Sequence, residues 1–155
     1  MGIAKEFVDE FNKLPSYTIE IGVISANTKR KETVRVGVTN AELMYIHENG
    51  SPLQNIPARP VLQMTIDYTN KHLLSRTIDK ALQAYVDSNF DVNAATEVFE
   101  KLCLRMENYA RKIIYSNDGR LAPNSPSVAK RKGGNHPLFD TGQLARSITC
   151  RLVIS

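Results

Sequence analysis

HPLFDTGQLARSI, residues 136–148, is the stretch that decides how the end of this chain folds. Its proline disfavours helix at the histidine before it. Either Asp140 or Thr141 can accept hydrogen bonds from the backbone of a turn that begins near Gly142. From Ile148 onward apolar and polar residues alternate to the last residue. The stretch therefore predicts an extended approach, a helix of one or two turns and a final strand inside a sheet.

Length and composition indicate one soluble domain covering residues 1–155. The chain has 42% hydrophobic and 23% charged residues, which is ordinary for a globular protein. No apolar run is long enough to span a bilayer, and the start lacks the apolar core of a signal peptide, so we expect a cytosolic protein. The net charge of +4 permits contact with nucleic acid without requiring it.

Apolar periodicity predicts the elements that precede the terminal stretch. Residues 3–14 read as a short helix, and residues 41–48 as another that follows a cap at Thr39-Asn40 and ends at Gly50. Alternation at 17–23 and 34–38 predicts a β-hairpin. A long helix from Val61 to about residue 89 is expected to bury Leu62, Ile66, Leu73, Ile78, Ala81, Leu82 and Tyr85.

A second long helix, capped by Asn93 and ending near Tyr115, is expected to pair with the first in antiparallel fashion. The predicted fold class is α+β. An antiparallel sheet of three or more strands, formed by the hairpin and the C-terminal strand, packs against the two long helices, with the short N-terminal helix added.

Two clusters of basic residues interrupt these elements. The hairpin tip carries Lys29, Arg30 and Lys31, and the connection after the second long helix carries Lys130, Arg131 and Lys132. Both can face DNA, because phosphate attraction needs only positive charge, or they can be solvated loops. The connection at 117–140 is long and rich in proline and glycine, so we expect a loop that is mobile until it binds a partner, or a solvated connector.

No motif for catalysis or cofactor binding is present. His47 and Glu48 adjoin, but no second histidine has the spacing of a zinc protease, so we expect a structural, hydrogen-bonded pair. Cys103 and Cys150 lack metal-ligand spacing, and we expect reduced, packed thiols, with a disulfide or a reactive thiol as alternatives. We therefore expect no enzyme, no cofactor and no bound metal.

Arg59 lies in the sequence IPARP, where two prolines fix the direction of the chain. The planar guanidinium suits bidentate binding of a carboxylate. Glu48, Asp140 or an acidic group of a neighbouring subunit can supply that carboxylate. Arg59 is therefore either an internal brace or a contact between subunits, and Pro60 suits the first position of the helix that follows.

Two blocks, IHENGSPLQNIPARPVL at 46–62 and LAPNSPSVAKRKGGNHPLFDTGQLARSI at 121–148, together resemble the tail-completion or neck proteins of long-tailed bacteriophages. In that family a glycine and an Ile-Pro-Ala-Arg-Pro segment precede a Pro-Leu-x-Asp-Thr-Gly-x-Leu-x-x-Ser-Ile segment. Both occur here in the same order. The chain departs from the family at Ser51, where many relatives have threonine, and at Val61, where they usually have phenylalanine.

The resemblance implies a structural virion protein at the head-to-tail junction, assembled in the host cytoplasm. It implies a ring, commonly six-fold, that contacts connector, tail-terminator or tail-tube proteins and passing DNA, and no membrane. The expected interface residues are Arg59, Pro60, Pro123, Pro126, Leu138, Asp140, Thr141 and Gly142. A free nucleic-acid-binding module and an assembly factor absent from the finished particle are the alternatives.

Overall fold

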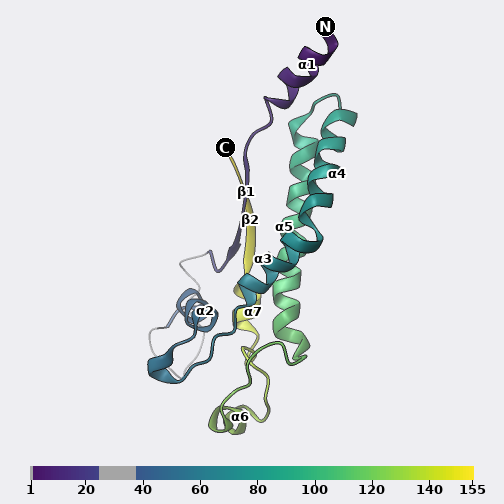
Figure 1. Ribbon diagram of the computed structural model, residues 1–155. Coiled ribbons are helices and arrows are strands. Elements are labelled where there is room, and N and C mark those ends of the chain that lie inside the picture. Colours follow the sequence, from purple (N-terminus) through teal and green to yellow (C-terminus); the bar gives the residue numbers. More distant parts are fainter. Residues whose placement is uncertain (1, 25–37) are drawn as a thin grey trace.

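The structure, a computed structural model, describes residues 2–24 and 38–155 and is built mainly of helices (Figure 1). The predicted N-terminal helix, the helix after Thr39, the second long helix and the terminal helix and strand are confirmed, with bounds shifted by a few residues. The predicted cap of the second long helix is wrong, because Asp91 rather than Asn93 is its N-cap. In chain order the elements are α1 (Gly2–Phe11), β1 (Tyr17–Gly22), α2 (Asn40–Asn49), the 3-10 turn η1 (Pro52–Gln54), α3 (Val61–His72), α4 (Leu74–Asp87), α5 (Val92–Ser116), α6 (Pro126–Lys132), α7 (Gln143–Ser147) and β2 (Thr149–Ile154).

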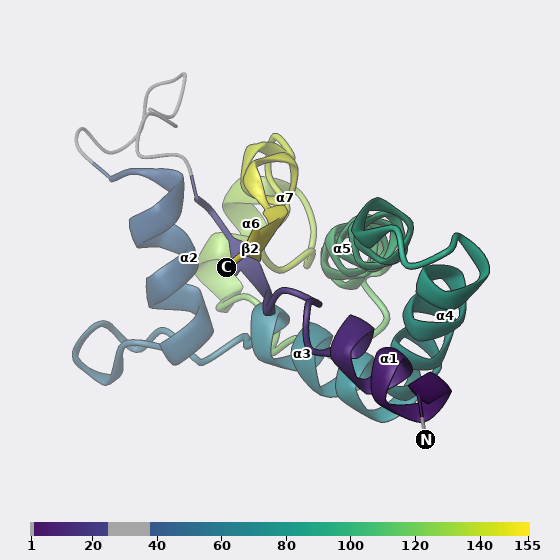
Figure 2. The same cartoon turned by 90° about the horizontal axis from the view of Figure 1, so that it is seen from above.

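The predicted fold class is wrong, because the sheet has only two strands within residues 2–24 and 38–155. β1 and β2 pair antiparallel, with Tyr17 opposite Ile154 and Gly22 opposite Thr149. The second strand of the predicted hairpin, at 34–38, lies outside the described residues except for Val38, which is in no strand. Helices rather than further strands cover this ribbon: α5 contacts both strands, and the ribbon lies between α2 and α5 (Figure 2).

The first long helix is broken in two, which is a second correction. Leu73, with φ of −119° and ψ of −37°, separates the end of α3 from the start of α4, and the two helices run in different directions (Figure 1). The hydroxyls of Thr69 and Thr77, on either side of the break, donate to the carbonyl oxygens of Thr65 and Leu73 at 2.8 and 2.9 Å. Such extra donors on the helix backbone bend helices.

The buried face of α3 and α4 also differs from the predicted stripe. The buried side chains follow a four-residue spacing: Val61, Thr65, Thr69, Thr77, Ala81 and Tyr85. Ile66, Ile78 and Leu82, expected inside, are 36%, 41% and 38% exposed. Because each buried threonine satisfies its hydroxyl on the preceding turn, it can pack inside without an unmet hydrogen bond.

The main core joins the middle of the chain to its end. It gathers side chains from α2, α3, the C-terminal half of α5, the loops before and after α6, α7 and the residue after α7: Met44, Val61, Ala110, Ile113, Ile114, Leu121, Leu138, Leu144, Ala145 and Ile148. A smaller cluster of Ala81, Tyr85 and Ala95 lies where α4 turns into α5. α1 attaches there, since the Tyr85 hydroxyl donates to the carbonyl oxygen of Glu10 at 2.9 Å.

Candidate functional site

The first of the two blocks forms a tight turn between α2 and α3. α2 begins at a capping box between Thr39 and Glu42 and stops before Gly50, whose φ of +74° favours glycine. Ser51 and Ile56 then form an isolated antiparallel bridge. A Cβ on Gly50 would lie 2.9 Å from the backbone nitrogen of Ala58, so a larger residue would push the turn open.

Glu48 caps the helix that follows this turn. Its carboxylate oxygens accept from the backbone N–H groups of Leu62 at 3.0 Å and Gln63 at 2.7 Å. These N–H groups belong to the first turn of α3, which offers them no acceptor, and the positive end of the helix dipole favours a carboxylate there. Glu48 is thus a structural residue that is hydrogen-bonded to the backbone of α3, and it is not the acceptor for Arg59.

Arg59 is an internal brace that joins the first block to the second. Its side chain is 4% exposed, and its Nε and Nη2 donate to the carbonyl oxygens of Ala122 at 2.7 Å and Pro123 at 2.8 Å. Its Nη1 lies 3.2 Å from Nδ1 of His47. Because a guanidinium only donates, this His47 nitrogen is the acceptor. Burial lowers the pKa of the guanidinium. Two carbonyl oxygens and Nδ1 of His47, rather than the carboxylate expected from the sequence, thus accept from the three nitrogens of the Arg59 guanidinium.

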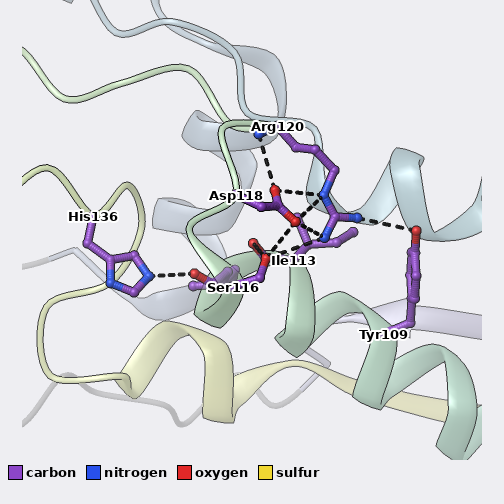
Figure 3. Close-up of polar contacts among 7 residues, drawn as sticks. Tyr109, Ile113, Ser116, Asp118, Arg120 and His136 are labelled. Atoms are coloured by element: carbon purple, nitrogen blue, oxygen red, sulfur yellow. Dashed lines mark hydrogen bonds and ion pairs between the residues drawn. The ribbon is translucent and has the colours of Figure 1, made fainter.

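A polar cluster closes the C-terminus of α5, just before the second block (Figure 3). Nε of Arg120 donates to both carboxylate oxygens of Asp118 at 2.9 Å, and the Ser116 hydroxyl donates to Asp118 at 3.0 Å. Nη1 of Arg120 reaches the hydroxyl of Tyr109 at 3.4 Å. The Arg120 guanidinium holds the pKa of the Asp118 carboxyl well below its usual range. This cluster was not predicted from the sequence, although an aspartate and an arginine two residues apart, just after a helix stop, indicate such a closure.

The second block is held against α5 by further contacts. Nε2 of His136 lies 2.7 Å from the carbonyl oxygen of Ile114 at the end of α5 (Figure 3). The His136 ring also stacks on Phe139, with centroids 4.6 Å apart. Nζ of Lys132, at the end of α6, donates to the carbonyl oxygen of Phe139 at 3.0 Å. Leu138 is buried in the main core. The loop is therefore tied to the domain at both its start and its end.

The entry to α7 differs from the predicted cap. The N-cap is Gly142, with φ of +75°, and no side chain caps the helix, so the prediction that Asp140 or Thr141 does so is wrong. The chain turns sharply at this glycine, and Nη2 of Arg146 donates to the Thr141 carbonyl oxygen at 2.9 Å. That bond ties the loop before α7 to its last turn.

The predicted interface residues fall into two groups. Pro123, Pro126, Asp140 and Thr141 are exposed and Pro60 is partly exposed, whereas Arg59, Leu138 and Gly142 are buried within the chain. Of the predicted DNA-facing residues, Lys130 and Arg131 are exposed on α6, and Lys132 is partly buried. Lys29, Arg30 and Lys31 lie outside the described residues.

The described part of the chain holds no group of three or more His, Cys, Asp or Glu side chains placed to bind a metal. None of its helices is long and apolar enough to cross a membrane. The site presents a braced loop with exposed proline and polar residues. Comparisons with models of protein families, with characterised proteins and with solved structures found no match.

Proposed function

We propose that this chain is a structural protein of a tailed bacteriophage particle, placed at the head-to-tail junction, where copies form a ring that joins the tail to the connector. The observation that carries the proposal is the joining of the two blocks that resemble neck proteins. They are separated by most of α3 and by α4 and α5, yet Arg59 of the first binds the backbone of Ala122 and Pro123 in the second. Two segments that each resemble the neck proteins and that also contact each other in the fold support the proposal better than two resembling segments that lie apart.

The surface around this unit supports a role in assembly. Leu53, at the tip of the turn in the first block, is 99% exposed, and Tyr45 on α2 is 72% exposed. Because contiguous exposed apolar surface marks docking sites, we infer that these two side chains contribute to one apolar docking patch. The exposed part of the second block, with Pro123, Asp140 and Thr141, provides a different kind of surface. A closed ring needs two unlike patches on each copy, and these two surfaces are the candidates.

The experiment is genetic complementation of a phage that lacks this gene, combined with mass spectrometry of purified particles. The proposal expects the chain in the particle, and unjoined heads and tails without it. Leu53→Asp should fold and fail to complement, whereas Gln54→Asp, which adds the same charge at the neighbouring exposed position, should complement. Absence of the chain from purified particles contradicts the proposed function. Full complementation by Leu53→Asp contradicts the docking surface at Leu53.

The rival candidate is a free nucleic-acid-binding module, and the observation in its favour is the exposure of Lys130 and Arg131 on α6. Binding of the isolated protein to duplex DNA that weakens steeply with added salt would favour this rival. Lys130→Gln together with Arg131→Gln should then reduce the salt dependence. Under the virion proposal the same double variant still joins heads to tails.

A further inference from the structure

Cys103 and Cys150 meet across the contact between α5 and the C-terminal strand. They are 47 residues apart in sequence, and the Cys150 thiol donates to Sγ of Cys103 at 2.8 Å. Cys103 is 5% exposed, and Cys150 is partly exposed. Both are free thiols. No pattern in the sequence brings these two residues together, because their separation is set only by how β2 lies on α5.

The surrounding contacts fix the strand at this position. The backbone N–H of Cys150 donates to a carboxylate oxygen of Glu107, one turn after Cys103 on α5, at 3.2 Å. Glu107 in turn pairs with Arg111 at 2.6 Å, and Nη2 of Arg111 donates to the carbonyl oxygen of Ile148 at 2.9 Å. Glu107 and Arg111, one turn apart on α5, therefore hold the backbone at Cys150 and just before it, next to Cys103.

We propose that Cys103 and Cys150 form an intramolecular disulfide when the folded protein meets a small disulfide oxidant such as oxidised glutathione, and that this bond fastens β2 to α5. The more accessible Cys150, as thiolate, attacks the oxidant, breaks its S–S bond and releases one molecule of reduced glutathione. The Cys103 thiolate then attacks Sγ of Cys150 and releases the second. Two thiol protons pass to solvent and the released thiolates, so two protein thiols are oxidised and one glutathione disulfide is reduced.

The bond would close a loop that contains the C-terminal half of α5 and the whole second block, with α6 and α7. Because such a loop has far fewer conformations in the unfolded chain, the cross-link stabilises the folded state. Burial raises the pKa of both thiols, so few are thiolates at neutral pH and the exchange is slow. The protein would remain reduced where a thiol pool is kept reduced, and would become cross-linked after transfer to oxidising surroundings.

The test uses the full chain with oxidised glutathione, acid quenching, and alkylation of the remaining thiols before intact-mass and peptide analysis. The wild type should lose the mass of two hydrogens and yield one cross-linked peptide pair containing Cys103 and Cys150. Dithiothreitol should reverse the change. The oxidised form should melt roughly 5–10 °C higher than the reduced form. Cys103→Ser and Cys150→Ser, checked for folding by circular dichroism, should give neither the cross-link nor the shift.

Three results would overturn the proposal. One is that the folded wild type stays reduced under oxidant conditions that do modify the thiols of the same chain when it is unfolded in guanidinium. Another is accumulation of the mixed glutathione disulfide at Cys150 without closure onto Cys103. The third is a disulfide between two chains in place of the internal one. If a serine variant does not fold, the alanine variant at the same position replaces it, since the cross-link itself is read in the wild type.

Discussion

Replacing Arg59 with methionine tests the brace between the two blocks. Methionine keeps much of the aliphatic stem and removes the guanidinium, which binds the carbonyl oxygens of Ala122 and Pro123 and Nδ1 of His47. The three acceptors lose their donor, and the loop after α5 loses its main polar attachment to the turn before α3. We expect lower stability and a looser loop.

The magnitude follows from the exposure of the acceptors. A hydrogen bond from a charged donor contributes about 1.5–3 kcal/mol when its loss leaves a buried acceptor unmet. Ala122 is partly exposed and Pro123 is exposed, so water can replace part of what the Arg59 guanidinium supplies. We therefore expect Arg59→Met to lower the free energy of unfolding by about 2–4 kcal/mol. Arg59→Lys keeps the charge but loses the fork of donors, and should lower it by about 1–2 kcal/mol.

The assay is urea unfolding of the full chain followed by far-UV circular dichroism, with limited proteolysis as a second readout of the loop. Arg131→Met is the matched control, because Arg131 is exposed on α6, and it should change the unfolding free energy by less than about 0.5 kcal/mol. If Arg59→Met and Arg131→Met unfold at the same urea concentration, or if cleavage between α5 and α7 is no faster in Arg59→Met, the brace does not hold the loop.

Three further predictions concern the turn at Gly50, the N-terminal cap of α2 and the stretch before α7. Gly50→Ala and Gly133→Ala both place alanine at positive φ, but only the Gly50 position has backbone within 3 Å of the new Cβ. Both should lose about 1 kcal/mol from strain, and Gly50→Ala at least about 1 kcal/mol more; equal losses in urea unfolding would contradict the close packing. The backbone N–H and the hydroxyl of Thr39 lower the pKa of Glu42 from its ordinary 4.5. The contribution of the ionised Glu42 to stability is therefore present above pH 4.5 and is lost as the pH falls through the lowered pKa. The difference in unfolding free energy between wild type and Glu42→Gln should shrink on acidification. A constant difference from pH 7 to 3 would refute this. Asp140→Ala should change the unfolding free energy by less than about 0.5 kcal/mol, because Asp140 is exposed and caps no helix; loss of head-to-tail joining by this stable variant would mark Asp140 as a partner contact, and a large loss of stability would show that the cap exists after all.

Elements whose ends depend on neighbouring residues were predictable from the sequence. α2 starts at Thr39 and stops before Gly50 because a capping box and a glycine with positive φ act within a few residues. β2 was predictable for the same reason, since alternation of side chains is a local property. The sequence likewise pointed to a defined direction for Arg59, because prolines on both sides restrict the backbone there.

Choices of partner and of buried face were decided only by the tertiary structure. Hydrophobicity alone favoured Ile66 over Thr65 as a core residue, yet Thr65 is fully buried, because its hydroxyl bonds within the helix and its small side chain fits the contact. Arg59 donates to carbonyl oxygens more than sixty residues away rather than to the nearby Glu48, because the Glu48 carboxylate accepts from the N–H groups of α3. The buried face of a helix and the partner of a side chain depend on which surfaces meet when the chain folds. A short-range sequence pattern does not contain that information.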